Sequence, residues 1–242
     1  MHQILSLPFE APDDDISLIE QKPASILFLT SASSDISTLS TIISLPKFSS
    51  LSGQIRALSL EKLNHPAQID HYLSTTAANA KVIILRLLGG RGHWNYGLDQ
   101  LQIWRQNSDS RKLIILAGTI DEFNELHSLN SIDIDLSSKL ASLLISGGKE
   151  NMTMFLDNII KLMDNKILNK STIVEKVIVD PYKWDWREED SSPVGIIYYK
   201  SLYLSSDLSV PIYMNKILRS KGLSPKSIFV SSLSKYDIVQ NV

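Results

Sequence analysis

The 242-residue chain contains no cysteine. The lack of cysteine excludes disulfides, thiolate metal sites and a cysteine nucleophile, and it fits a reducing compartment. Basic residues are not in excess either, because 24 Lys and Arg are set against 26 Asp and Glu, which leaves a net charge of −2. A chain with this charge and no basic stripe has no general attraction to nucleic acid or to an anionic membrane surface.

Long apolar runs are also absent. A helix that spans a membrane needs about 20 apolar residues, whereas the longest run, residues 82–88, contains Arg86 and ends at a glycine. The N-terminal region carries Asp13, Asp14 and Asp15 where a signal peptide would be basic and then apolar. Three adjacent carboxylates diverge, so we interpret this triplet as a solvated loop in preference to a cation site. We predict a cytoplasmic protein with no membrane partner.

The apolar content of 43% and charged content of 21% are ordinary for a globular protein. Short apolar runs predict buried strands at 26–29, 82–85 and 113–116, and residues 55–60 are interpreted as a further strand. Apolar residues at helical spacing predict helices at 36–43, 66–73, 98–104, 121–129, 137–145 and 152–163. Strands that alternate with helices indicate a parallel sheet covered on both faces. The predicted fold class is therefore α/β, with a parallel-sheet, Rossmann-like N-terminal domain over residues 1–180.

The remainder of the chain predicts the beginning of a second α/β domain. Residues 173–179 have β-like composition, and the mixed aromatic and charged segment 181–192 is interpreted as a linker. A strand at 194–199, a helix at 211–218 and a strand at 227–230 then form one βαβ unit. One such unit cannot cover both faces of a sheet, so residues 193–242 are interpreted as the first unit of an incomplete domain.

The most distinctive loop follows the strand predicted at 82–85. It contains Gly89, Gly90 and Gly92, and the polar and aromatic residues His93, Trp94, Asn95 and Tyr96 come directly after it. A strand, a glycine turn and a helix in this order place functional groups at the carboxyl edge of a sheet. A dinucleotide fingerprint would need a glycine where Asn95 stands, and it would follow the first strand. The loop also lacks the Gly-Lys-Ser/Thr ending of a P-loop, so we interpret it as a glycine turn without a nucleotide.

Arg86 is a charge inside an apolar strand, and two interpretations are open. It either pairs with an acid or reaches solvent, or it faces a cleft and binds an anionic group. The structural interpretation is favoured because a buried charge is tolerated only when it is paired. His93 could carry a proton or bind a metal, although a single loop histidine is more often structural. The serines lack a G-x-S-x-G elbow, and we predict no catalytic residue and no metal site in this chain.

Two separated stretches resemble one family. The first is Leu85-Arg86-Leu87-Leu88-Gly89-Gly90, followed by Trp94, Tyr96, Gly97 and Leu101. The second is Pro193-Val194-Gly195-Ile196-Ile197-Tyr198-Tyr199, followed by Pro211-Ile212, Gly222-Leu223-Ser224-Pro225 and Ile228-Phe229-Val230. In order and spacing they are similar to the cobaltochelatase large subunit (CobN), whose family includes the magnesium chelatase H-subunit. The chain departs from the family at Ser205-Ser206-Asp207, where a small glycine-containing turn is usual.

The resemblance implies the N-terminal part of the large subunit of an ATP-dependent cobaltochelatase, a ligase that forms nitrogen–metal bonds. Such an enzyme inserts Co²⁺ into hydrogenobyrinic acid a,c-diamide during aerobic cobalamin biosynthesis. The implied partners are the corrinoid substrate, accessory chelatase subunits and AAA+ subunits that hydrolyse ATP. Family members are several times longer, so the resemblance implies a truncated or split subunit. We therefore expect this chain alone to be catalytically incompetent and to bind neither Co²⁺ nor ATP.

Residues of the glycine loop and the strand before it are predicted to contact the tetrapyrrole cleft or a partner subunit. These residues are Arg86, Gly89, Gly90, Arg91, His93, Trp94 and Tyr96. Two alternatives remain open: a non-catalytic protein-interaction remnant of a truncated or split chelatase subunit, and a fragment of a magnesium chelatase H-subunit. A small-molecule enzyme on a doubly wound scaffold is disfavoured, because each catalytic motif considered is missing.

Overall fold

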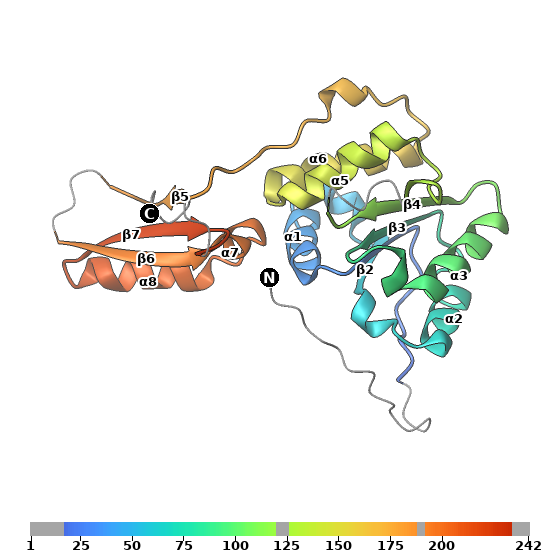
Figure 1. Ribbon diagram of the computed structural model, residues 1–242, viewed down its shortest axis with the longest axis horizontal. Coiled ribbons are helices and arrows are strands. Elements are labelled where there is room, and N and C mark those ends of the chain that lie inside the picture. The colour runs from blue at the N-terminus through green and yellow to red at the C-terminus, as the bar shows by residue number, and fades with distance from the viewer. Residues whose placement is uncertain (1–16, 120–125, 188–191, 234–242) are drawn as a thin grey trace.

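The computed structural model describes residues 17–119, 126–187 and 192–233 of the chain. The acidic triplet at 13–15 lies outside this part, as do residues 121–125 of the helix predicted at 121–129. The described residues form two units, each built around its own sheet (Figure 1). No helix within the described residues combines the length and apolar character needed to cross a membrane.

The N-terminal unit is a four-stranded parallel sheet in the order β2-β1-β3-β4. Its strands are β1 (Ile26–Thr30), β2 (Ile55–Ser59), β3 (Val82–Leu87) and β4 (Lys112–Ala117). All four coincide with predicted strands. The residues of β1 and β3 are buried throughout, as expected for continuous apolar runs at the centre of a parallel sheet.

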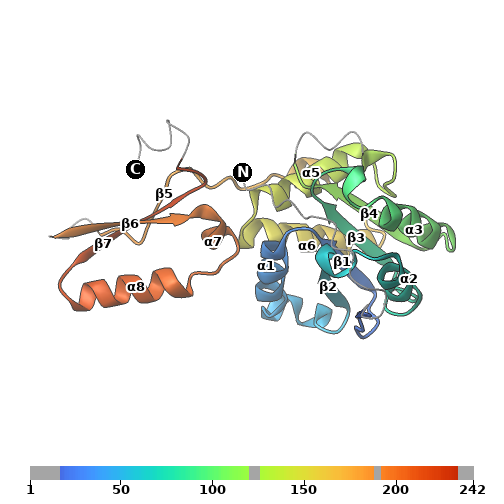
Figure 2. The same cartoon turned by 60° about the horizontal axis from the view of Figure 1, so that its bottom comes forward.

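Helices cover both faces of this sheet (Figure 2). One face packs against α1 (Ser33–Ile43), α5 (Ile134–Ser146) and α6 (Lys149–Met163), and the other packs against α2 (Pro66–Ser74) and α3 (Asn95–Gln106). Short 3-10 helices lie at Pro46–Leu51, Leu60–Lys62, Arg91–His93 and Lys170–Thr172. The predicted Rossmann-like α/β class is confirmed.

The starts of two helices follow from local sequence. Pro66 occupies the beginning of α2, and the His65 side chain accepts a hydrogen bond from the backbone N–H of Ala67 at 3.2 Å. The Gln68 side chain in turn accepts from the His65 backbone, which completes a capping box. Asp133 caps α5 by accepting from the Leu136 N–H at 3.1 Å.

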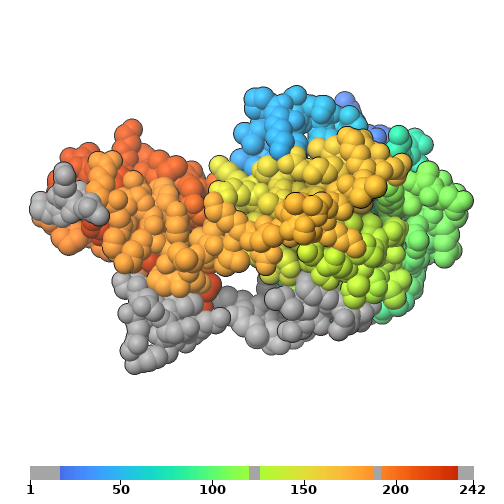
Figure 3. All heavy atoms as spheres, turned by 90° about the horizontal axis from the view of Figure 1, so that it is seen from above, coloured from blue at the N-terminus to red at the C-terminus, as the bar shows by residue number. Residues whose placement is uncertain are grey.

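The strand-like prediction for residues 173–179 is wrong. The segment is not part of a sheet, and Val174, Val177 and Val179 are exposed. Its backbone bonds to a side chain, because Asn151 of α6 accepts from the Lys176 N–H and donates to the Lys176 carbonyl oxygen. Figure 3 shows the chain after α6 running along the surface of the α-helical layer towards the second unit. Residues 173–179 are therefore a connection between the two units with no partner strand in the described part of the chain, despite their β-branched composition.

The second unit contains β5 (Tyr182–Trp184), β6 (Pro193–Tyr199), α7 (Lys200–Leu204), α8 (Ser209–Ser220) and β7 (Ser224–Val230). Its sheet has the order β5-β7-β6, with β6 parallel and β5 antiparallel to β7. The strands and the helix predicted after residue 193 are present. However, β5 lies inside the range predicted as a linker, 181–192, so this range contributes a strand to the second sheet. The Phe229 ring anchors the unit, with the Tyr198 and Tyr203 ring centroids each 5.4 Å away.

Candidate functional site at the carboxyl edge of the sheet

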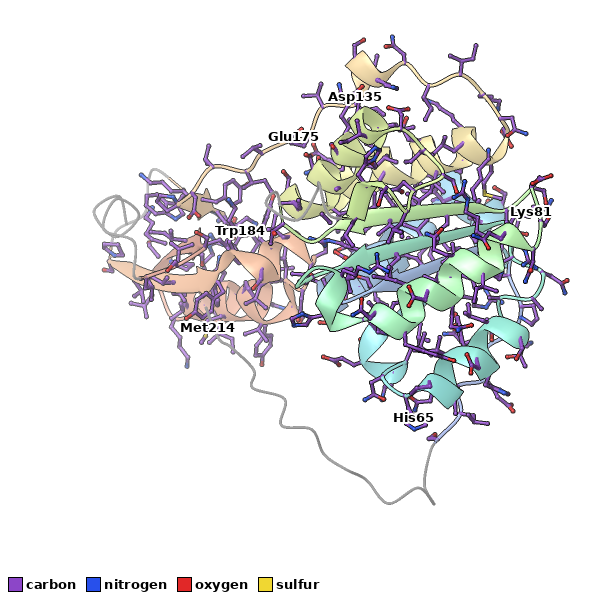
Figure 4. All side chains as sticks on the ribbon, turned by 45° about the vertical axis from the view of Figure 1, so that its right-hand side comes forward. His65, Lys81, Asp135, Glu175, Trp184 and Met214 are labelled. Atoms are coloured by element: carbon purple, nitrogen blue, oxygen red, sulfur yellow. The ribbon has the colours of Figure 1, made fainter. Side chains whose placement is uncertain are left out.

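The two central strands of the N-terminal sheet end side by side at one edge. From β1 the chain passes through α1 to β2 on one side, and from β3 it passes through α3 to β4 on the other. In open α/β sheets this reversal creates a crevice outside the carboxyl ends of the strands. Lys81, which directly precedes β3, lies at the opposite end of the sheet from the second unit (Figure 4). The second unit therefore faces the carboxyl edge.

A buried ion pair occupies this edge. Arg86, near the end of β3, places its Nη1 atom 2.5 Å from Oδ1 of Asp35 in the first turn of α1. Both residues are almost fully buried, with exposures of 7% and 6%. The Thr30 hydroxyl donates to the other Asp35 oxygen at 2.7 Å. The prediction that Arg86 pairs with an acid is confirmed, and the acid comes from the neighbouring crossover.

The Arg86–Asp35 ion pair does not use all the hydrogen-bond donors of the Arg86 guanidinium. Arg86 Nε is buried and has no hydrogen-bond partner among the described residues. Asp35 is supported by its position in the first turn of α1, where the helix dipole favours negative charge. The edge thus holds a neutral pair with one guanidinium N–H still available for a polar group.

The glycine loop follows β3 directly, and its backbone requires glycine at two positions. Gly89 and Gly90 have φ values of +90° and +69°. A Cβ at Gly89 would lie 2.5 Å from His93 Nδ1, so the histidine ring packs directly over the glycine. His93 therefore fills space beside the turn, as in the structural interpretation of this residue.

The other predicted contact residues point elsewhere. Trp94 is buried in the core between the sheet and α2–α3, and its Nε1 donates to the Leu63 carbonyl oxygen at 2.7 Å. On the exposed surface, Tyr96 donates to the Asp70 carboxylate at 2.9 Å, a bond that raises the pKa of Tyr96. Arg91 forms an exposed pair with Asp99 at 3.2 Å. Arg86 alone of the seven predicted residues lines the cavities described next.

A small cavity lies between the ion pair and the second unit. Its volume is about 140 Å³. It is lined by the beginning of α1, the end of β3, the α5–α6 junction and α7, through Asp35, Arg86, Gly147 and Leu204 among others. Thr38 Oγ1 of α1 donates to the Ser34 carbonyl oxygen at 2.9 Å and lies 3.3 Å from the Leu204 carbonyl oxygen, so this hydroxyl is shared between the two units. Leu204 also contacts Gly147, where a Cβ would lie 3.3 Å from the Leu204 Cβ.

A larger cavity of about 420 Å³ adjoins it and shares Gly147 and Gly148. Tyr182 and Tyr203 of the second unit form one wall, and residues 176–179 form another. The hydrogen bond from the Tyr203 hydroxyl to that of Tyr182, together with burial, raises the pKa of Tyr203 to about 12. The Tyr203 phenol is therefore a neutral hydrogen-bonding group near neutral pH.

Several residues at this edge of the sheet are not predicted from the sequence as site residues. The predicted contact residues include neither Asp35 nor the two glycines of the α5–α6 junction, Gly147 and Gly148. Their positive φ values of 64° and 88° show that the junction needs glycine. The one local indication for Asp35 is that it is a polar residue in the first helical turn after a buried strand. Within residues 17–119, 126–187 and 192–233, no three His, Cys, Asp or Glu side chains could together hold a metal ion.

The chain was compared with families, curated proteins and solved structures. No protein-family model matches it. It is 27% identical to the aerobic cobaltochelatase subunit CobN of a Sinorhizobium species over 252 residues, which cover 96% of this chain and 20% of the relative. It is 24% identical to CobN of Pseudomonas aeruginosa, covering 93% of this chain and 18% of that relative. The resemblance to CobN is confirmed.

A solved structure agrees with the sequence matches. The catalytic subunit of cobaltochelatase from Mycobacterium tuberculosis superposes with a TM-score of 0.62 at 14% identity, covering 91% of this chain and 17% of that one. At this identity the superposition shows that the fold is shared. The chain spans about a fifth of the length of the CobN relatives, 20% and 18% of the two subunits.

Proposed function

We propose that this chain is the N-terminal portion of a CobN-type large subunit and acts in a cobaltochelatase. The observation that carries the proposal is the sequence match to two CobN subunits over 93–96% of the chain. In the proposed reaction, Co²⁺ and hydrogenobyrinic acid a,c-diamide are the substrates, and separate AAA+ subunits hydrolyse ATP in the cytoplasm. The proposed metal is cobalt because both relatives are named as cobaltochelatase subunits.

We assign the chain a role in assembly of the large subunit in preference to contact with the corrinoid. The cavity beside Arg86, about 140 Å³, is smaller than ligand pockets, which commonly measure roughly 300–1,000 Å³. The adjoining cavity of about 420 Å³ is within that range, but none of the predicted contact residues lines it. Trp94 lies in the core, and Arg91 and Tyr96 are engaged with neighbours on the α3 surface. These placements favour a role for the glycine-loop residues in stabilising the fold over a role in lining a binding cleft. Cobalt insertion is assigned to polypeptide that the relatives carry outside the matched fifth.

Reconstituted cobalt insertion tests the proposal. The chain would be mixed with a polypeptide comprising the rest of the Sinorhizobium CobN, the ATPase subunits, ATP, Co²⁺ and hydrogenobyrinic acid a,c-diamide. We expect insertion, followed by the corrinoid absorbance change, to require the chain. Insertion at the same rate without the chain would refute the proposal. A titration of the chain alone with the corrinoid tests the assembly role, and tight binding to the isolated chain would restore the cleft-wall role.

A further inference from the structure

Apolar side chains are exposed on two parts of the second unit, one face of β6 and the flank of α8. Seven large residues of β6 and α8 have exposures between 38% and 65%: Ile197, Tyr199, Val210, Ile212, Tyr213, Met214 and Ile217. Single exposed apolar residues are normal on protein surfaces, whereas a contiguous group indicates an interaction site. Met214 lies on the outer surface of the second unit in Figure 4.

The exposed residues of α8 form a regular stripe. Val210, Tyr213, Met214 and Ile217 recur at positions i, i+3, i+4 and i+7, the spacing of one helix face. The buried side of α8 is a different one, because it carries Pro211 and Asn215. At 100° per residue the two sides are separated by roughly 120° around the helix axis. A second apolar stripe beside the sheet-facing one predicts that another helix packs against the flank of α8.

The adjacent strand β6 lies at the edge of its sheet. It pairs with β7 on one side, and no strand among the described residues pairs with its other side. None of its seven residues, PVGIIYY, is charged, so the edge lacks the lysine or glutamate that commonly protects an exposed strand. An uncharged, apolar edge strand readily accepts a further strand.

The face of β6 turned away from α8 is partly uncovered, although Ile228 and Val230 of β7 on the same face are buried. Ser227 of β7 bonds to Asn215 of α8, and Phe229, two residues further along the strand, contacts Tyr203 of α7, so these side chains share the helix-covered face. Tyr198 stands opposite Phe229 and stacks on it. Side chains alternate along a strand, so Ile197 and Tyr199 point to the other face. Their exposures of 47% and 60% show that little covers them.

We propose that β6 and the flank of α8 together form a docking surface for an αβα segment of a CobN-type subunit. The segment would add a strand to the free edge of β6, cover Ile197 and Tyr199 with one helix, and pack its other helix against the α8 stripe. Parallel pairing of β6 with β7 favours this occupant, because parallel sheets are covered by helices on both faces. The CobN relatives extend well beyond the matched 20% and 18%, which supplies such a segment. This inference rests on the proposed function.

Binding of the chain to the rest of the Sinorhizobium CobN tests the surface. The test variant is Tyr213→Glu combined with Met214→Glu, two side chains that are 65% and 44% exposed. The matched control is Ile103→Glu on α3, a residue 50% exposed on the N-terminal unit. Each variant is first checked by circular dichroism. A third variant, Ile197→Asp, tests the β6 part of the surface.

We expect the double variant to weaken binding by at least about 30-fold, since two central apolar anchors are lost, and the control to stay within about twofold of the original. Hydrogen exchange of the 194–199 amides should slow in the complex. Equal binding by the double variant, or no slowing at 194–199, would overturn the inference. So would a stable dimer of the chain alone that protects the same amides, since a second copy would then be the occupant.

The two proposals fail in different ways. If cobalt insertion requires the chain but the α8 variants are fully active and bind normally, the docking surface is wrong and the proposed function stands. If the rest of CobN binds at β6 and α8 but insertion does not require the chain, the docking surface stands and the proposed function is wrong.

Discussion

Replacing Arg86 with methionine tests whether the buried ion pair organises the carboxyl edge of the sheet. The change keeps an unbranched side chain of similar length but leaves the Asp35 carboxylate, 6% exposed, without its cationic partner. Removing one member of a buried pair typically costs about 3–5 kcal/mol. Asp35 would keep the Thr30 hydroxyl at 2.7 Å and the favourable end of the α1 dipole, which offsets up to about 1 kcal/mol. We therefore expect a loss of about 2–4 kcal/mol in the free energy of unfolding.

Urea unfolding followed by far-UV circular dichroism measures this loss. Asp35→Leu and the double variant with Arg86→Met complete a thermodynamic cycle. Because an apolar pair can replace a buried ion pair at little cost, the double variant should be more stable than the sum of the single changes predicts, by at least about 1 kcal/mol. The matched control is Arg91→Met in the exposed Arg91–Asp99 pair, which should cost about 0.5 kcal/mol or less. The reasoning would be refuted if the stability losses of the two single variants simply added up in the double variant. It would also be refuted if Arg86→Met lost no more stability than Arg91→Met.

Two further predictions concern local structure. Gly89→Val should lower the free energy of unfolding by about 1–3 kcal/mol or more, because valine disfavours a φ of +90° and its Cβ would lie 2.5 Å from the His93 ring. Gly92→Val is the control, since a Cβ at that position has nothing within 4 Å. Equal urea midpoints for the two variants would contradict the prediction. Asp133→Ala should cost about 1 kcal/mol through loss of the α5 cap, whereas Asp133→Asn keeps the cap and loses only the exposed pair with Lys170. Hydrogen bonding to Lys170 lowers the pKa of Asp133 below its usual 3.8. The stability that the Asp133–Lys170 pair contributes is therefore present above pH 3.8 and is lost as the pH falls through the lowered pKa of the folded state. The difference between the original chain and Asp133→Asn should therefore shrink in acid urea titrations, and a difference that grows there would show that the ion pair is not its source.

The predictions of β1, β3 and β4 are confirmed because each contains an uninterrupted apolar run whose burial on both faces depends mainly on local composition. The capped start of α2 at Pro66 is equally local. Residues 173–179 show where this reasoning fails. Their composition suits a strand, but a strand also needs a partner edge, and here the Asn151 side chain bonds to the backbone of Lys176. The opposite error concerns β5, a three-residue strand in a mixed segment that pairs with β7 more than 40 residues later, as Tyr182 with Phe229.

The candidate site was predictable only in part. Arg86 stood out because a charge in a buried strand demands a partner, but its partner Asp35 lies 51 residues earlier in the chain. Trp94 belongs to the motif shared with CobN, yet its indole lies in the core and bonds to Leu63. A motif shows that residues occur together in the sequence and leaves open whether their side chains point into a cleft or into the core.

Local apolar patterns and residue identity were sufficient to predict the α/β class, the strands of the first sheet and the resemblance to CobN. The folded structure was needed to show which acid neutralises Arg86 and where β5 pairs. It was also needed to show how the second unit meets the carboxyl edge through the Thr38–Leu204 contact, between residues 166 positions apart. Only the structure, likewise, showed that the apolar stripe of α8 is exposed. The physical reason is the same in each case. Such contacts join residues far apart in the chain, and local patterns do not encode which distant surfaces meet.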